Sequence, residues 1–273
     1  MRLVAVWTLA LANSAYAATV DGAKIYWKST GNGRQDVILV HGWTCDDSSW
    51  AEQVPVLWRT YRVVTLDLPG HGQSGMPNGT WSMELFARAV EAVRAEAKID
   101  KAVLVGHSMG TPVIRKYALM YPEHVSGLVL VDGLVQIPNP SAAAGPPRAG
   151  GPGPMTGPDG LKAREAMIRG MFGPLTTPPL QQHIMKMMMG APEATAAGAM
   201  AATQDRTQWS DKPITVPVLA VYAGTRPLAS ETAVKTLYPS AEYHQIPETA
   251  HFLMMERPTE FNRLLVAFLE SVR

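Results

Sequence analysis

The chain has 273 residues, with 24 Lys and Arg against 23 Asp and Glu. This length suits one sizeable domain with an insertion, and nothing indicates a second independent domain. Balanced charge argues against nucleic acid or an anionic membrane as the main partner. The single cysteine, Cys45, excludes an internal disulfide and is expected to be a small buried thiol. The histidines are scattered without metal-ligand spacing, so no metal is expected, and His124 and His183 read as structural or surface residues.

The first residues predict a secretory signal peptide, residues 1–17. Arg2 is followed by the apolar residues 3–12, and Ser14-Ala15-Tyr16-Ala17-Ala18 then offers a small-x-small cleavage site. Such a short apolar stretch cannot serve as a stable membrane anchor, because crossing a bilayer takes ~20 residues. We expect cleavage after Ala17 and export to the periplasm or the medium. Loss of Arg2 would leave 23 basic residues, one fewer than 24, against 23 acidic ones.

Strand and helix patterns alternate along the following part of the chain. Residues 20–27 read as an early strand and turn, and the apolar residues 37–40 and 61–66 predict two buried strands. Residues 81–98 carry apolar side chains three to four positions apart, which is typical of a helix packed on a sheet. This alternation predicts a mostly parallel sheet that is covered by helices on both faces.

A serine between two glycines follows the apolar residues 102–105. The segment Gly106-His107-Ser108-Met109-Gly110 has the form of a nucleophile elbow, a strained strand-to-helix turn whose flanking positions favour glycine. Residues 111–121 can form the helix that must follow, because Pro112 is tolerated in a first turn. This context favours a catalytic Ser108 over a loop with a capping serine.

The second half of the chain contains further core elements and an insertion. The core elements are three strands and a closing helix, expected at residues 125–131, 216–222, 242–246 and 258–272. The Pro/Gly/Ala tract at residues 138–160 opposes both helix and strand. Residues 161–209 then read as short helices, interrupted at Gly173-Pro174 and at Pro178-Pro179.

Methionines are concentrated in this insertion. Eight of the fifteen lie there: Met155, Met167, Met171, Met185, Met187, Met188, Met189 and Met200. A methionine-rich surface can repack around different apolar ligands. Their density favours a lid that closes over an apolar pocket, although any single one can simply fill the underside of the lid.

Four segments in this order resemble the α/β-hydrolase family over nearly the whole chain. They are the elbow, residues 37–43 with His41-Gly42-Trp43, residues 67–74 and residues 247–252. The resemblance implies an α/β-hydrolase fold, a mostly parallel central sheet flanked by helices, with a helical lid inserted after the sixth strand.

The implied organisation has three parts. Residues 1–17 form the signal peptide, residues 18–138 and 214–273 form the hydrolase core, and residues 139–213 form the Pro/Gly-rich arm and the Met-rich helical lid.

The resemblance also implies catalytic roles. A serine hydroxyl needs a base at neutral pH, and His251 is expected to accept the Ser108 proton during attack on a carbonyl. His41 and His107 stand where the family has structural residues. The backbone N–H groups of Met109 and Trp43 would bind the oxyanion. The Trp43 ring either walls the acyl pocket or packs against the lid.

The acid that orients the histidine departs from the family's commonest pattern. There an aspartate follows the strand that corresponds to residues 216–222, but residues 223–228 contain no carboxylate. Some members carry the acid at the end of the preceding strand, where this chain has Asp132. We therefore predict Asp132, while Glu231, Glu248 and a degraded triad remain alternatives.

Arg226 stands in the segment where the family usually has its acid. A cation beside His251 would disfavour the imidazolium that forms in the transition state. We therefore expect the Arg226 side chain to point away from His251.

The sequence thus predicts an exported serine hydrolase that acts through an acyl-enzyme on small to medium, partly apolar ester substrates, without cofactor. A C–C bond hydrolase, a lactonase or a perhydrolase would resemble it in these motifs. Dehalogenases and epoxide hydrolases would require aspartate in place of Ser108. The missing acid after Tyr222 also leaves open a non-catalytic ligand-binding protein on a hydrolase scaffold.

Overall fold

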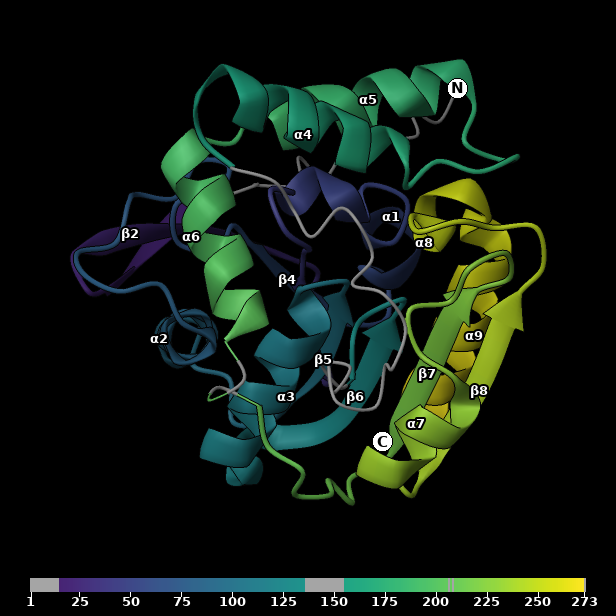
Figure 1. Cartoon of the computed structure of the whole chain (residues 1–273). Coiled ribbons are helices and arrows are strands. Elements are labelled where there is room, and N and C mark those ends of the chain that lie inside the picture. The colour runs from purple at the N-terminus through teal and green to yellow at the C-terminus, as the bar shows by residue number, and fades with distance from the viewer. Residues whose placement is uncertain (1–14, 136–154, 206, 208, 273) are drawn as a thin grey trace, which may run out of the picture.

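An eight-stranded sheet forms the centre of the computed structural model, which describes residues 15–135, 155–205, 207 and 209–272 (Figure 1). From one edge to the other the strands are β1 (Ala15–Val20), β2 (Ala23–Thr30), β4 (Arg62–Leu66), β3 (Asp36–Val40), β5 (Ala102–His107), β6 (Val125–Val131), β7 (Val218–Ala223) and β8 (Ala241–Ile246). The pairs β1/β2 and β2/β4 are antiparallel, and all the other pairs are parallel. The carboxyl ends of the parallel strands therefore meet at one edge of the sheet, where ligands bind in open α/β sheets.

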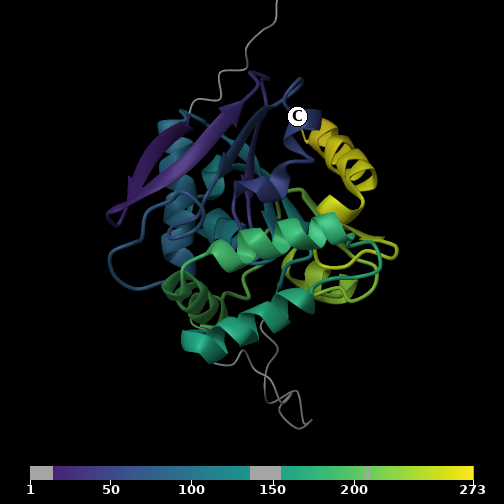
Figure 2. The same ribbon diagram turned by 90° about the horizontal axis from the view of Figure 1, so that it is seen from above.

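Helices cover both faces of this sheet. The core helices are α1 (Val54–Leu57), α2 (Met83–Glu96), α3 (Gly110–Met120), α7 (Glu231–Leu237), α8 (Leu253–Glu256) and α9 (Pro258–Ser271), with short 3-10 turns η1 (Asp47–Trp50) and η2 (Pro122–His124). Helices α2 and α3 pack on one face, and α9 lies on the other (Figure 2). Every residue of β5 is buried, as expected for a central parallel strand covered on both sides.

The apolar periodicity of the long helices corresponds to their buried faces. In α2 the buried positions include Phe86 and Val90, and the Ser82 hydroxyl caps the helix by accepting a hydrogen bond from the Leu85 N–H at 3.0 Å. In α9 the predicted inward residues Phe261 and Leu265 are fully buried. These helices bury one apolar stripe each, which is why their sequence pattern predicts them well.

Between β6 and β7 the described residues form three inserted helices: α4 (Gly157–Arg169), α5 (Pro178–Gly190) and α6 (Glu193–Gln204). Helices α4 and α5 lie beyond the carboxyl ends of the strands (Figure 1). Hydrogen bonds join α6 to core loops. The Trp43 indole N–H donates to Ala196 O at 2.9 Å, and the Thr195 hydroxyl donates to Gly70 O at 2.8 Å and lies 3.5 Å from the Met76 sulfur. These bonds hold α6 against the loops that follow the carboxyl ends of β3 and β4.

Two boundaries of this insertion differ from the prediction. Pro178 and Pro179 begin α5 instead of interrupting a helix, because a proline in the first turn gives up an N–H that has no intrahelical partner there. Residues 157–160, expected in the arm, form the first turn of α4. Residues 136–154 of the predicted arm lie outside the described residues.

The structure describes only the last three residues of the predicted signal peptide. Residues 1–14 lie outside the described residues, whereas Ala15 to Ala17 belong to β1 and pair with Lys28 to Tyr26 of β2. The predicted cleavage after Ala17 would shorten this edge strand. Of the helices in the described ranges, none is both long and apolar enough to cross a membrane.

Candidate active site

The turn after β5 places Ser108 at the edge of the sheet. Ser108 has φ 53°, in the left-handed region that costs a side chain strain. A Cβ at Gly106 would lie 2.4 Å from the carbonyl oxygen of Gly110, and a Cβ at Gly110 would lie 2.4 Å from that of Val40. The Ser108 N–H donates to Val131 O at 2.9 Å, which fixes the strained turn to β6. Both flanking glycines are therefore required by close backbone contacts.

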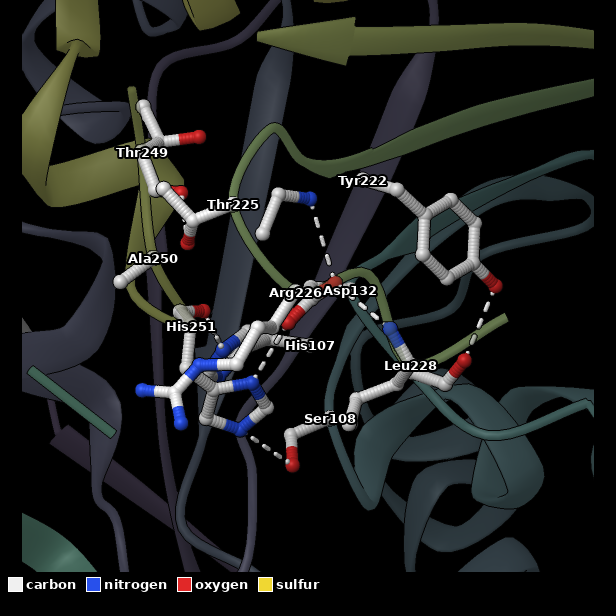
Figure 3. Close-up of polar contacts among 12 residues, drawn as sticks. His107, Ser108, Asp132, Tyr222, Thr225, Arg226, Leu228, Thr249, Ala250 and His251 are labelled. Atoms are coloured by element: carbon white, nitrogen blue, oxygen red, sulfur yellow. Dashed lines mark hydrogen bonds and ion pairs between the residues drawn. The ribbon is translucent and has the colours of Figure 1, made fainter. Parts of the chain in front are cut away.

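Three predicted site residues meet at this turn (Figure 3). The His251 imidazole lies with Nε2 at 2.9 Å from Ser108 Oγ and with Nδ1 at 2.7 Å from Asp132 Oδ2. Asp132 is 1% exposed and follows β6, whereas His251 lies in the loop between β8 and α8. Because Asp132 is a carboxylate acceptor, Nδ1 carries the proton and Nε2 is free to accept one from Ser108.

Backbone groups hold the other oxygen of the Asp132 carboxylate. Asp132 Oδ1 accepts hydrogen bonds from the N–H groups of Ala223 at 3.2 Å and Leu228 at 3.3 Å. These donors belong to residues 223–228, the segment in which the family usually carries the acid. The carboxylate that contacts His251 thus lies at the end of β6, and the segment after β7 supplies two N–H groups that fix its orientation.

The alternative acids do not reach His251. Glu231 forms a salt bridge with Lys235 at 2.6 Å, and Glu248 forms one with Arg257 at 2.9 Å. Both pairs lie on exposed parts of the surface.

The two histidines near glycines make structural hydrogen bonds. His107 Nε2 donates to His251 O at 2.9 Å, because a carbonyl oxygen can only accept. His41 Nε2 accepts from the Leu68 N–H at 2.9 Å, and Nδ1 donates to Gly42 O at 2.8 Å. Burial lowers the pKa of both imidazoles, so both are neutral near pH 7. His107 thereby holds the backbone of the residue that faces Ser108.

The residues predicted to donate N–H groups to the oxyanion, Met109 and Trp43, both lie near Ser108. Met109 is the N-cap of α3, and the loop of Trp43 is so close that a Cβ at Gly42 would lie 3.0 Å from Ser108 Cβ. Within the described chain no backbone hydrogen bond uses the Met109 or Trp43 N–H. The Trp43 side chain is buried and donates to Ala196 O in α6, so it packs against the inserted helices and does not wall the cavity beside Ser108.

A cavity of about 550 Å³ opens beside the three residues. Its lining is Ser108, Asp132, Gly170, Met171, Thr225, Arg226, Pro227, Leu228, Ala250 and His251. The volume falls in the range of small-molecule sites. Arg226, which was expected to point away from His251, lines the same cavity as His251. Its guanidinium donates to Gly170 O at 3.2 Å, and no hydrogen bond joins it to His251 (Figure 3).

The remaining reactive groups lie elsewhere. Cys45 is buried, and burial raises the pKa of its thiol to about 12, which leaves it protonated and unreactive at neutral pH. In the ranges that the structure describes, no group of three or more His, Cys, Asp or Glu residues could hold a metal ion.

A strained serine between a parallel strand and a helix, facing a histidine and a buried carboxylate, is the site architecture of α/β hydrolases. The model of the alpha/beta hydrolase family matches residues 37–264, and the chain belongs to this family.

Curated relatives with several activities are similar to this chain. The dihydrolipoyllysine-residue acetyltransferase component of the acetoin cleaving system of Pseudomonas putida is 29% identical, over 93% of this chain and 69% of its own length. The corresponding Cupriavidus necator protein is 36% identical, but over only 42% of this chain and 30% of its own. A 2-hydroxy-6-oxononadienedioate/2-hydroxy-6-oxononatrienedioate hydrolase of Paraburkholderia phymatum is 27% identical, over 94% of this chain and 96% of its own.

Solved structures give the same fold. A thermophilic esterase of Thermogutta terrifontis, determined with malate bound, superimposes with a TM-score of 0.80 at 26% identity, covering 95% of this chain and 98% of its own. Est816, an N-acyl homoserine lactone degrading enzyme, superimposes with a TM-score of 0.76 at 26% identity, covering 93% of this chain and 100% of its own. The similar proteins thus include acetyltransferase components, a hydrolase of 2-hydroxy-6-oxo dioates, an esterase and a lactone-degrading enzyme.

Proposed function

We propose that the protein is a serine hydrolase that cleaves carboxylic esters through an acyl-enzyme. Ser108 is the nucleophile, His251 is the general base and acid, and Asp132 holds the imidazole in its working tautomer. The observation that carries this proposal is the continuous relay from Ser108 Oγ through His251 to Asp132, with contacts of 2.9 and 2.7 Å. The similarity to esterases supports the choice of an ester bond.

The first half of the reaction forms the acyl-enzyme. Ser108 Oγ bonds to the carbonyl carbon while its proton moves to His251 Nε2. The negative charge on the carbonyl oxygen is stabilised by the N–H groups of Met109 and Trp43, each worth ~3 kcal/mol or more in such a site. The tetrahedral intermediate then collapses, and the proton on Nε2 passes to the departing alcohol oxygen.

The second half reverses these roles with water. His251 Nε2 accepts a proton from a water molecule whose oxygen attacks the acyl carbon. The bond to Ser108 Oγ breaks, Oγ recovers the proton from Nε2, and the carboxylic acid leaves. The proton on His251 Nδ1 stays there throughout, and the Asp132 carboxylate accepts its hydrogen bond and stabilises the imidazolium in both halves. No cofactor takes part in this proposed sequence.

A lactonase is the second candidate. A lactone is a cyclic ester, so the same relay would open it without an additional group, and the similarity to a lactone-degrading enzyme supports testing it. C–C bond hydrolysis is a further outcome that the substrate panel must distinguish from ester hydrolysis.

Two further proposals concern the flanking segments. Helices α4 to α6 would act as a lid that selects substrates by chain length. This proposal is supported by Gly170 and Met171, which lie in the connection between α4 and α5 and line the cavity. Residues 1–17 would direct export, after which the mature chain begins at Ala18.

A fluorophosphonate probe combined with a substrate panel tests this function. The panel contains p-nitrophenyl esters of rising chain length, aliphatic lactones and a C–C hydrolase substrate. We expect probe labelling of the wild type and turnover of the esters, with an optimum in chain length. Labelling without any turnover would favour a binding protein, and turnover of the C–C substrate alone would replace the ester proposal.

A further inference from the structure

The cavity beside Ser108 contains a cation with no anionic partner in the described chain. The Arg226 guanidinium donates one hydrogen bond, at 3.2 Å, to the neutral carbonyl of Gly170. Arginine is always charged at neutral pH, and its planar fork of N–H groups matches a carboxylate. Arg226 is exposed to solvent, and the Gly170 carbonyl is the one hydrogen-bond acceptor that the described residues provide for it, so most of its N–H groups remain available to a ligand.

The carboxylates around the site are already occupied. Asp132 accepts from His251 and from two backbone N–H groups. Glu256, in α8, accepts from the Thr176 hydroxyl and the Ala250 N–H, each at 2.5 Å. Glu248 pairs with Arg257 at 2.9 Å. The protein thus supplies no neutralising charge for Arg226 from these neighbours.

The rest of the cavity wall is mainly apolar, with Met171, Pro227, Leu228 and Ala250 facing it. A neutral, apolar substrate would displace water from the guanidinium without offering it a hydrogen-bond acceptor. An anionic substrate group would instead form a charge-assisted hydrogen bond, which is roughly twice as strong as a neutral one. The wall therefore favours a substrate that is apolar along its length and carries a negative charge at one point.

The position of Arg226 also affects the chemistry. A cation in the same cavity as His251 raises the free energy of the imidazolium that forms in the transition state. A carboxylate bound to Arg226 would offset that charge and remove most of this cost. Substrate charge would thus raise kcat as well as lower KM.

We propose that Arg226 is a specificity-determining residue that binds a free carboxylate of the substrate, and that the preferred substrates are esters carrying such a carboxylate away from the scissile bond. This inference rests on the proposed ester hydrolysis at Ser108. It names one charged group of the substrate and leaves the relay unchanged.

Two matched substrate pairs test the proposal. One pair places the charge on the acyl side: monomethyl adipate and its neutral amide, methyl 5-carbamoylpentanoate. The other places it on the alcohol side: 6-acetoxyhexanoate and the corresponding amide. Within each pair the carboxylate and the carboxamide have nearly the same size and shape, so the ratio of their kcat/KM values isolates the charge.

The variants are Arg226→Gln, which removes the charge, and Arg226→Lys, which keeps it without the fork. Arg169→Gln is the matched control, because Arg169 lies one residue before Gly170 but is already paired with Glu165 at 2.7 Å. For at least one pair, wild type should prefer the carboxylate ester by about tenfold or more, as expected for one hydrogen bond between charged groups.

The Arg226→Gln variant should lose that preference, Arg226→Lys should keep part of it, and Arg169→Gln should keep all of it. The preference should also shrink as NaCl is added, since salt screens a partly exposed charge. Activity on the amide substrates shows that each variant is folded.

Wild type that treats acid and amide alike in both pairs, or an Arg226→Gln variant that loses activity equally on both, would overturn the inference. If Ser108-dependent hydrolysis occurs but does not distinguish acid from amide, the proposed role of Arg226 is refuted and the proposed ester hydrolysis stands. A folded protein that hydrolyses none of these esters refutes the proposed function as well.

Discussion

The contact between Asp132 and the backbone N–H groups of Ala223 and Leu228 predicts the effect of an isosteric change. In Asp132→Asn these two donors fix the amide oxygen, so the amide NH₂ faces His251 Nδ1. Nδ1 must then accept, which moves the imidazole proton to Nε2 and prevents it from taking the Ser108 proton. We expect kcat to fall about 10⁴-fold on p-nitrophenyl acetate, with little change in melting temperature.

Glu231→Gln and Glu248→Gln are the controls for this experiment. Their carboxylates pair with exposed cations and not with His251, so each variant should retain most of the wild-type kcat. If Asp132→Asn stays active while one of these controls loses activity, the acid has been assigned to the wrong residue.

The sequence predicts the positions of the relay residues better than their surroundings. Ser108 is predictable because two glycines and a preceding strand define a strained turn, and Asp132 because parallel strands end at one edge. The place of Arg226 in the cavity wall is not predictable from the sequence, because the cavity is formed by segments that are far apart in the chain. The N–H donors that hold Asp132 left no sequence signal, since backbone groups carry none.

At the scale of elements, the connection between α4 and α5 lies against the loop that carries His251. A Cβ at Gly173 would lie 2.6 Å from the Ala250 Cβ, and Glu256 links Thr176 of the connection to the Ala250 N–H. The position of the inserted helices and the position of His251 are therefore coupled.

The variant Gly173→Ala tests this coupling. Two methyl groups cannot approach to 2.6 Å, so the connection and the histidine loop must separate by roughly an ångström. Because a misplacement of that size can cost about 10²-fold in rate, we expect a fall in kcat/KM of at least tenfold.

Gly190→Ala is the matched control, because a Cβ at Gly190 meets nothing within 4 Å. It should leave kcat/KM unchanged and keep or slightly raise the melting temperature. Wild-type kinetics for Gly173→Ala would show that the connection does not constrain His251.

Element boundaries show where sequence patterns are informative. At residues 20–27, predicted as an early strand and turn, the structure has the end of β1, a turn and the first part of β2. The other predicted strands and the long helices α2 and α9 agree with the structure to within a few residues, because their apolar spacing follows directly from the faces that they bury. Pro178-Pro179 begins α5, because proline is favoured in the first turn of a helix as well as at a break. Helices α1 and α7 were not predicted, since each is too short to show a repeating apolar stripe.

At the scale of the whole molecule, one buried carboxylate links stability to pH. Asp67 is 1% exposed and accepts hydrogen bonds from the N–H groups of Asp47 and Gln73, both at 2.8 Å, which joins β4 to two surface loops. Burial is the main cause that raises the pKa of Asp67 to about 7, with further contributions from the charges of Asp47 and Asp46.

The sign of this linkage follows from proton binding. Between the unfolded pKa near 3.8 and the folded pKa of about 7, the folded state holds the Asp67 proton more tightly than the unfolded state does. The contribution of Asp67 to the free energy of unfolding therefore falls as pH rises through this window.

Urea denaturation of wild type and Asp67→Asn at pH 5 and pH 8 measures this contribution. The free energy of unfolding of wild type minus that of the variant should be smaller at pH 8 than at pH 5. A difference that is constant or grows with pH would contradict the raised pKa of Asp67.

The central claim, an acyl-enzyme on Ser108, is tested most directly by acid quench and peptide mass mapping. Wild type is mixed with p-nitrophenyl acetate, quenched during turnover and digested. We expect a single acetyl group on the wild-type peptide that contains Ser108. In Ser108→Ala that peptide should carry no acetyl group, and only residual turnover should remain. Turnover by wild type with no acetylated Ser108 peptide, together with near wild-type activity in Ser108→Ala, would rule out an acyl-enzyme on Ser108.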